Sequence, residues 1–337
     1  MFRLGEYMSK PPASHEVTPG SPFGLTVVVP CLNEADNIEA AYDEIRAELG
    51  AYDELEILFV DDGSTDATLA NIRALAERDK GVSYLSFTRN FGLEAAFSAG
   101  YRYARNPWLL HLDADLQFPP AEAHLLIECA RTEGMDAVFG IRVDRQDRLV
   151  RRAGSALHDL IARRVLGIEI PAGGSSFRLV RSDLARRIVD LGLGTPYFLA
   201  TLPRLTRSWT TVPVRHQPRR SGEAKVTVRG LARHAIELFV SFSTRTIALA
   251  AMLCLLAAVA AVGGAVAAAI PGGLPVTGVL LGLAAAAGLI SLAVIARYLV
   301  HVGRGQPQTP QFLIRETNLV VRSTDLLAAL PARTAAG

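Results

Sequence analysis

Residues 109–122 read LLHLDADLQFPPAE, and this stretch decides the fold. An apolar run ends at Asp113 and Asp115, after which Pro119 and Pro120 predict the start of a helix. Two carboxylates one residue apart at the mouth of a buried strand repel each other unless a counter-charge lies between them. A divalent cation supplies that charge, and ligands that are all oxygen atoms favour Mg²⁺ or Mn²⁺. The alternative is an exposed turn in which the two aspartates bind nothing.

Strand-like and helix-like segments alternate on both sides of this stretch. Strands are predicted at 25–29, 56–60, 82–87, 109–112 and 136–141. A helix that ends at Leu49 follows the exit of the first strand at 30–34, and further helices are predicted at 67–78, 92–104 and 119–132. Alternation of this kind predicts an α/β fold with a mostly parallel sheet flanked by helices. In such a fold the ligand binds at the carboxyl ends of the strands. The domain is expected to cover residues 24–225.

Polar residues follow three of the predicted strands at the points where they end. They are Asn33 and Glu34, which come after Pro30 at the end of the first strand, DDGSTD at 61–66 after the second strand, and Asp113, Asp115 and Gln117 after the fourth. Glu34 and Asp62 are assigned to the ribose and base of a nucleotide, because carboxylates accept hydrogen bonds from hydroxyl and N–H groups. The alternative for DDGSTD is a turn in which Thr65 or Asp66 caps the next helix.

The last third of the chain carries an apolar excess. No charged residue lies between residues 246 and 296, and the run PGGLP at 271–275 divides this region in two. Each half is long enough to cross a hydrocarbon core of about 30 Å, so a transmembrane hairpin is predicted over residues 244–300. Buried alanine-rich core helices are the alternative. Arginines lie at both outer ends of the hairpin, which predicts that the large domain faces the cytoplasm at the inner membrane.

Basic residues crowd the region just before that hairpin, although the net charge is only +2. Basic groups beside a membrane attract anionic headgroups by roughly 1 kcal/mol each. Interfacial helices are therefore expected at 148–167 and 226–243, with surface helices packed on the sheet as the alternative. Nucleic acid is not expected as a partner, because no aromatic-interleaved motif accompanies the basic cluster. Residues 1–23 are expected to be a flexible tail, residues 301–337 a cytoplasmic tail, and the cysteines reduced thiols.

Five motifs, in order along the chain, resemble those of the family 2 glycosyltransferases with a GT-A fold. They are VVVPCLNEADNIE at 27–39, ILFVDDGSTDAT at 57–68, RNFGLEAAFSAGY at 89–101, DADLQFPPAE at 113–122 and RRSGEAK at 219–225. The chain is most similar to the bacterial dolichyl/polyprenyl-phosphate sugar transferases that end in a two-span membrane hairpin. The resemblance covers about residues 24–316.

This resemblance implies inverting transfer of a sugar from a UDP-sugar, or from GDP-mannose, to the phosphate of a polyprenyl lipid of the undecaprenyl type. The product would serve cell-envelope glycan or lipid modification. The implied nucleotide contacts are Pro30, Asn33, Glu34, Asp62 and Asn90 with Gly92; the implied metal and diphosphate contacts are Asp113, Asp115 and Gln117. Arg142, Arg151, Arg219 and Lys225 match residues that meet the lipid phosphate and close over the site.

Two segments depart from the family pattern. Where the family has an acidic residue in D-x-G-x-F-R-L, residues 172–179 read AGGSSFRL, so an acceptor-orienting carboxylate is missing while Ser175 and Ser176 offer hydroxyl groups. The usual GESKY reads GEAKV at 222–226, which keeps Lys225. A phosphate acceptor needs no strong base, since its second pKa is near 6.

Other functions stay open at this point. A processive polysaccharide synthase would be expected to show a Gln-x-x-Arg-Trp motif and more spans, which this sequence lacks. Another lipid acceptor and an inactive membrane scaffold of the same fold are further alternatives. The sequence leaves the sugar, the choice between UDP and GDP, and a homo-oligomeric state undecided.

Overall fold

The computed structural model describes residues 23–52, 54–142, 171, 174–191, 197–217, 244–268, 277–304 and 311–327. Three residues of the predicted site, Arg151, Arg219 and Lys225, lie outside the described residues. The two predicted interfacial helices, at 148–167 and 226–243, and residues 1–22 of the expected N-terminal tail also lie outside them.

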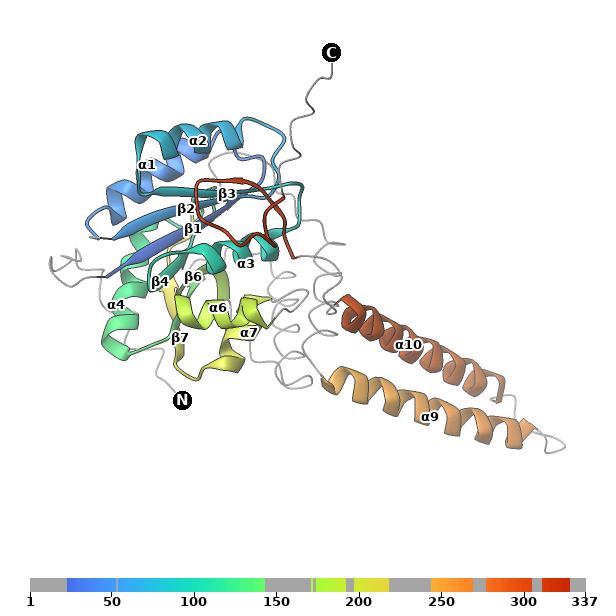
Figure 1. The fold of residues 1–337 in the computed structure, drawn as a ribbon. Helices are drawn as coiled ribbons and strands as arrows, with labels where there is room; N and C mark the ends of the chain where they lie inside the picture. Colours follow the sequence, from blue (N-terminus) through green and yellow to red (C-terminus); the bar gives the residue numbers. More distant parts are fainter. Residues whose placement is uncertain are drawn as a thin grey trace, which may run out of the picture.

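Eight strands of the described residues form one sheet (Figure 1). In spatial order they are β7 (Trp209–Val214), β5 (Ala137–Arg142), β6 (Gly174–Arg181), β4 (Trp108–His111), β1 (Leu25–Cys31), β2 (Leu55–Asp61), β3 (Val82–Phe87) and β8 (Ile314–Thr317). The strands β4, β1, β2 and β3 run parallel, whereas β6 is antiparallel to β4 and β8 is antiparallel to β3. The predicted mostly parallel α/β sheet is confirmed.

Helices cover both faces of the sheet, because side chains alternate across each strand. In β1, Val27 and Val29 join the core under α1 (Ile38–Leu49), α2 (Thr68–Arg78) and α4 (Ala123–Glu133). Val28 points the other way, into the core under α3 (Leu93–Tyr103), α6 (Ser182–Asp190) and α7 (Phe198–Leu205). Because both faces are covered, β1 is buried along its whole length, which explains its continuous apolar sequence.

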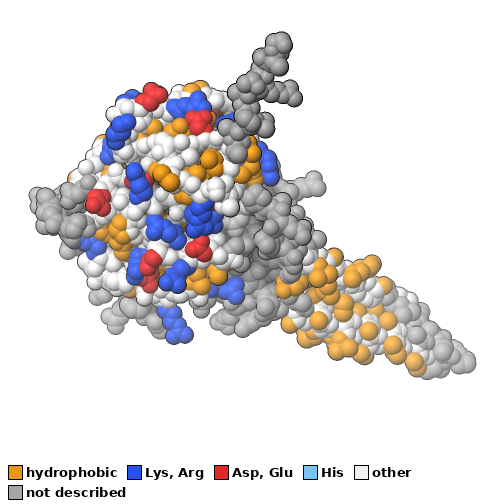
Figure 2. All heavy atoms as spheres, in the orientation of Figure 1, with side chains coloured by type: hydrophobic (Ala, Val, Ile, Leu, Met, Phe, Trp, Pro, Cys, Tyr) orange, Lys and Arg blue, Asp and Glu red, His pale blue; other side chains and the backbone are white. Residues whose placement is uncertain are grey.

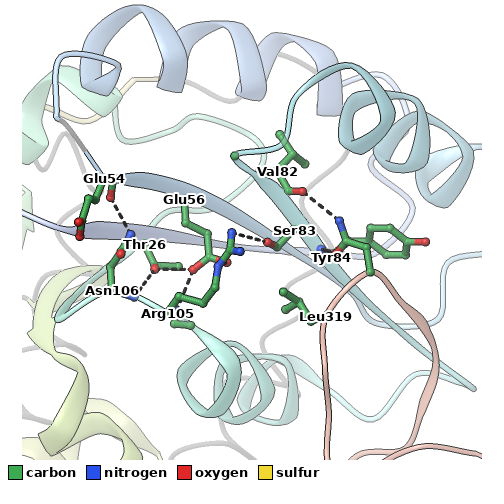
Figure 3. A network of polar contacts seen from close by, with 12 residues as sticks. Thr26, Glu54, Glu56, Val82, Ser83, Tyr84, Arg105, Asn106 and Leu319 are labelled. Carbon is green, nitrogen blue, oxygen red and sulfur yellow. Dashed lines mark hydrogen bonds and ion pairs between the residues drawn. The ribbon is translucent and has the colours of Figure 1, made fainter.

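The amino edge of the sheet, where the parallel strands begin, holds a polar network (Figure 3). Glu56 is 2% exposed and accepts hydrogen bonds from Thr26 Oγ1 at 2.7 Å and from Arg105 Nε at 2.8 Å. Arg105 also reaches Ser83, and Asn106 donates to the carbonyl oxygen of Leu25 at 2.9 Å. No buried side-chain N or O atom of these residues lacks a partner. The network joins the starts of β1, β2 and β3 to the segment before β4.

Residues 311–327, expected to lie in a cytoplasmic tail, return to the sheet and supply β8. Phe312 stacks on Phe87 at a ring distance of 5.4 Å, and the backbone N–H of Thr88 donates to the carbonyl oxygen of Leu313 at 3.0 Å. Beyond the strand, Asp325 pairs with Arg102 of α3 at 3.0 Å. Residues 311–327 are therefore packed against the domain core, and β8 covers the edge of β3.

Two long helices, α9 (Thr244–Ala268) and α10 (Thr277–Arg304), lie side by side and extend away from the domain (Figure 1). Small residues are buried on these helices, namely Ala250, Ala257, Ala284 and Ser291, whereas large apolar side chains such as Leu255 and Leu289 are 66% and 68% exposed. Figure 2 shows hydrophobic side chains spread over the visible face of the described part of the pair. Among the helices described, none meets the length and hydropathy required of a membrane-crossing segment, so the two predicted spans are not confirmed.

Candidate active site

The carboxyl edge of the sheet, where the parallel strands end, carries the acidic residues that the sequence assigned to one site. β1 pairs with β2 as far as Cys31 opposite Asp61, and it pairs with β4 as far as Val28 opposite His111. The turns containing Asn33, Asp62 and Asp113 follow directly after these strand ends. Parallel pairing therefore brings the three predicted turns to the same edge.

Asp113 is held by two neighbours. His111 Nε2 lies 3.2 Å from Asp113 Oδ1, and Ser176 Oγ donates to Asp113 Oδ2 at 2.6 Å. Burial by itself raises the pKa of Asp113, but the hydrogen bonds from His111 and Ser176 and the charge of Arg178 outweigh it, so the pKa lies below its usual value. Burial lowers the pKa of His111 to about 4, which leaves the ring neutral at pH 7. Asp113 is therefore a fixed, ionised carboxylate.

Asp115 and Gln117 lie on the tight turn that follows. Leu116 has a positive φ of 54°, and the backbone N–H of Gln117 donates to Asp115 Oδ1 at 3.2 Å. The carbonyl oxygen of Gln117 accepts from the N–H of Gln217 at 2.8 Å, which ties the turn to the segment after β7. Asp115 is 5% exposed.

The oxygen donors of Asp113, Asp115 and Gln117 fit the chemistry of Mg²⁺ or Mn²⁺. In the described part of the chain, however, no group of three or more His, Cys, Asp or Glu side chains is arranged to hold a metal ion.

Asn33 and Glu34 join the first turn to the DDGSTD turn. Asn33 has a φ of 53°, its N–H donates to Ser64 Oγ at 2.9 Å, and its Oδ1 accepts from the N–H of Thr65 at 2.9 Å. The N–H of Glu34 donates to Thr68 Oγ1 at 2.9 Å, while its carboxylate accepts from Asn37 Nδ2 at 2.6 Å. These bonds fix the two turns against each other.

Asp62 holds the RNFG turn, residues 89–92, in place in a similar way. Its two carboxylate oxygens accept from the backbone N–H groups of Phe91 at 2.7 Å and Gly92 at 2.9 Å. Burial raises its pKa, the two N–H bonds lower it, and the neighbouring Asp61 raises it further. Gly63, with φ of 72°, lies so close to Arg89 that an added Cβ would come within 2.4 Å of a backbone carbon. The DDGSTD and RNFG turns are therefore in backbone contact.

Asp61, the first residue of the same motif, points into the sheet. Its Oδ1 accepts from the N–H of Ser64 at 2.9 Å, and its Oδ2 accepts from Ser86 Oγ at 2.7 Å. Arg315 of β8 donates to the same Ser86 hydroxyl at 3.2 Å. The returning C-terminal strand thus contributes a cation next to the second turn.

Of the four basic residues predicted to meet the acceptor, the structure describes Arg142. It ends β5, and its guanidinium lies 5.5 Å from the ring centre of Phe118, directly after the Asp113–Gln117 turn. Phe118 in turn stacks on Phe177 of β6 at 5.3 Å and meets the edge of His216 at 5.2 Å. Arg142 is therefore placed beside the same turn as the two aspartates.

Several polar residues at this edge were not predicted as site residues. Arg178 of β6 is 3% exposed, donates through Nε to the hydroxyl of Tyr101 at 2.9 Å, and keeps Nη2 without a partner among the described residues. Glu94 Oε2, His111 Nδ1 and His216 Nε2 are likewise buried and unpartnered there. The histidines show no metal-ligand spacing along the chain, and only the pairing of β6 with β4 places Arg178 opposite His111.

Comparisons with known sequences agree on the family of the chain. Residues 26–189 match the model of glycosyl transferase family 2. The chain is 32% identical over 249 residues to an undecaprenyl-phosphate 4-deoxy-4-formamido-L-arabinose transferase of Salmonella enteritidis, covering 71% of this chain and 73% of the relative. It is 26% identical over 306 residues to the protein CsbB of Bacillus subtilis strain 168, covering 88% of this chain and 92% of the relative.

Solved structures show weaker likeness. A glucosyl-3-phosphoglycerate synthase of Mycobacterium tuberculosis, solved with Mn²⁺, UDP and glucosyl-3-phosphoglycerate, is 20% identical with a TM-score of 0.48, covering 66% of this chain and 80% of that one. A mannosyl-3-phosphoglycerate synthase of Rubrobacter xylanophilus is 19% identical with a TM-score of 0.45, covering 64% and 71%. The family model and the 32% identity to the Salmonella transferase show that the chain belongs to glycosyl transferase family 2.

Proposed function

We propose that this glycosyltransferase moves a sugar from a nucleotide-sugar to a polyprenyl phosphate of the undecaprenyl type, with inversion at the sugar. The observation that carries the proposal is the ionised Asp113, held by His111 and Ser176 beside Asp115 at the carboxyl edge. Relatives of the chain are named as undecaprenyl-phosphate 4-deoxy-4-formamido-L-arabinose transferases, which supports the lipid phosphate as acceptor. A UDP-sugar is the favoured donor, and GDP-mannose is the alternative.

The donor diphosphate is assigned to the turn after β4. Asp113, Asp115 and Gln117 would hold Mg²⁺ or Mn²⁺, and the cation would supply positive charge to the departing diphosphate. The ribose and base are assigned to the turns after β1 and β2. Glu34 and Asp62 already accept hydrogen bonds within the protein, but a carboxylate can accept about four, so each keeps capacity for a ligand.

The acceptor is proposed to be a phosphate because of the residues that flank Asp113. The segment at 172–179 lacks the acidic residue of the family pattern, and Ser176 of this segment donates to Asp113. A phosphate monoester needs no base, since it is largely ionised at pH 7. Its oxygen would form a bond to the anomeric carbon while the bond from that carbon to the diphosphate oxygen breaks. Arg142, together with Arg151, Arg219 and Lys225, is assigned to the acceptor phosphate, because arginine binds phosphate bidentately.

The helices α9 and α10 are proposed to be the lipid-facing part of the chain, in a protein of the cytoplasmic membrane whose domain faces the cytoplasm. The pair has small residues inside and large apolar residues outside, the reverse of a pair packed in water. Ser291 Oγ donates to the carbonyl oxygen of Ala287 at 2.8 Å, so its hydroxyl is satisfied within the helix. Both features suit an apolar solvent.

The activity is tested by release of UDP or GDP from nucleotide-sugars, with purified protein, Mn²⁺ and undecaprenyl phosphate in detergent. Wild-type protein should release nucleotide only when the lipid is present, and Asp115→Asn should lower the rate at least a hundredfold. Asp183→Asn, a surface aspartate on α6, is the matched control and should leave the rate unchanged. Release that requires a different lipid or a glycan would favour another acceptor, and no release from any donor would favour the inactive scaffold.

The membrane assignment is tested separately, by extraction of membranes from expressing cells. The full chain should stay with the membrane through alkaline carbonate and leave it only in detergent. Release by carbonate or by high salt would contradict the assignment of α9 and α10 to lipid.

A further inference from the structure

Two ionisable residues, Arg178 and Glu94, lie just behind the carboxyl edge and form no ion pair with each other. Arg178 is two residues along β6 from Ser176, which donates to Asp113. Glu94 is two residues along the chain from Gly92, which donates to Asp62. Because a strand advances about 3.4 Å per residue, Arg178 lies about 7 Å behind the edge.

Neither side chain forms an ion pair within the described residues. The guanidinium of Arg178 lies over the ring of Phe97 at 4.8 Å and of Phe198 at 5.6 Å, and its Nη2 has no partner there. Glu94 accepts a hydrogen bond from the backbone of Phe198, and its Oε2 is buried and unpartnered. Buried charges that are not paired act over longer distances, because little water screens them.

We propose that Arg178 and Glu94 are electrostatic positioning residues that set, with opposite signs, how tightly the carboxyl edge holds the diphosphate of the donor. This inference rests on the proposed function, which supplies that donor. Asp61, Asp62, Asp113 and Asp115 make the edge strongly acidic, so a diphosphate needs positive potential from elsewhere. Arg178 supplies such potential from behind Asp113, and Glu94 reduces it. Neither residue is assigned a contact with the donor.

The opposite signs separate this role from a structural one. If Arg178 and Glu94 only supported packing, neutralising either would loosen the edge and weaken binding. If they act through charge, Arg178→Gln weakens binding of the diphosphate and Glu94→Gln strengthens it. Arg178→Lys keeps the charge and should restore most of the affinity. Arg181→Gln is the matched control, because Arg181 lies on the same strand but pairs with Asp136 and Asp183 at the surface.

The test is titration calorimetry of the full-length protein with UDP and with GDP in the presence of Mn²⁺ at pH 8, where Glu94 is mostly ionised. Arg178→Gln should weaken binding about tenfold and raise the donor KM more than it lowers kcat. Glu94→Gln should tighten binding about threefold, and Arg181→Gln should change nothing. Weaker or unchanged binding by folded Glu94→Gln overturns the inference, even where Arg178→Gln does not fold. Wild-type protein that binds neither nucleotide would instead contradict the proposed function.

Discussion

Each of the two edges of the sheet holds a glutamate and an arginine, but only at the amino edge do the two side chains form an ion pair among the described residues. At the amino edge, Arg105 Nε meets Glu56 Oε1 at 2.8 Å, and Thr26 and a backbone N–H complete the carboxylate (Figure 3). At the carboxyl edge, Glu94 and Arg178 form no ion pair within the described residues, and each keeps a buried atom without a partner there. The sheet thus carries a closed polar network at its amino edge, in which every buried polar side-chain atom has a partner. At its carboxyl edge it carries an open one, in which Glu94 and Arg178 keep buried atoms without a partner among the described residues.

This difference indicates that the amino edge serves the stability of the fold and the carboxyl edge serves binding. A closed buried network holds the chain in one arrangement, and removing a member leaves another buried and unpaired. Unpartnered buried polar atoms are rare in folded proteins, and they are tolerated mainly where a ligand or a reaction requires them. We therefore expect changes at the amino edge to lower stability, and changes at the carboxyl edge to alter binding and activity first.

The largest expected effect is a loss of stability near the carboxyl edge. It tests whether every change at that edge alters binding before it alters stability. Phe312→Ala removes an apolar ring that is 2% exposed and stacked on Phe87, near the carboxyl end of β3. The variant should lose about 4 kcal/mol of unfolding free energy, measured by urea denaturation in detergent. A loss below about 1 kcal/mol would mean that the returning C-terminal segment is not part of the cooperative core.

A somewhat smaller loss of stability is expected at the amino edge. Arg105→Leu leaves the buried Glu56 with only Thr26 and a backbone N–H as partners, and the Arg105 side chain is itself 54% exposed, so the unfolding free energy should fall by about 2 kcal/mol while kcat/KM per folded molecule stays unchanged. Arg73→Leu is the control, because the pair of Arg73 with Glu316 is partly exposed and should contribute at most about 1 kcal/mol. A large fall in kcat/KM for Arg105→Leu would break the comparison between the two edges.

The pH dependence of stability probes the open network directly. Burial raises the pKa of Glu94 from 4.5 to about 7, against the lowering effect of Arg178 and of the Phe198 backbone. A carboxyl group with a raised pKa contributes its full stability below about pH 4.5 and loses it as the pH rises through 7. This loss is on the order of 3 kcal/mol at most.

Glu94→Gln should therefore flatten the fall in melting temperature between pH 5 and 8. The other titratable groups facing Glu94 stay out of this range: burial raises the pKa of Tyr197 to about 12 and raises that of Tyr101, while Arg178 remains charged. Identical pH profiles for the variant and the wild-type protein would show that Glu94 does not titrate in this way.

The smallest expected effect concerns Ser176. Ser176→Ala removes one of the hydrogen bonds that fix Asp113, so kcat/KM should fall about tenfold, with little change in melting temperature. Ser175→Ala is the matched control, since the Ser175 hydroxyl donates to the carbonyl oxygen of Gly140 at 2.7 Å and not to an acidic residue. Equal losses for the two variants would argue that only the backbone of this segment matters.

Much of the parallel part of the sheet was predictable from the sequence, because its signals are local. Apolar runs at 25–29, 56–60 and 82–87 do form β1, β2 and β3, and the turns after them lie at one edge, as the βα alternation implies. The strands β6, β7 and β8 were not assigned, because their places depend on pairing between distant parts of the chain. Residues 301–337 were expected to be a tail for the same reason.

The site shows the same division between local and distant signals. Asp113 and Asp115 were predicted as site residues because two carboxylates follow one strand. The hydroxyl of Ser176 was expected to form hydrogen bonds, but its partner Asp113 could not be named before β6 was known to pair with β4. Arg178 was missed because an arginine within a short apolar run gives no sign of what it will face.

The position of β8 has a consequence for how the protein is made. A ribosome delivers the N-terminal strands first, so β3 must wait with an open edge until α9 and α10 have been synthesised. Pairing of Phe87 with Ile314 is then among the last steps in completing the sheet. A nascent chain stalled within α10 would present an unprotected strand to its neighbours, which makes that stage of synthesis the one most exposed to aggregation.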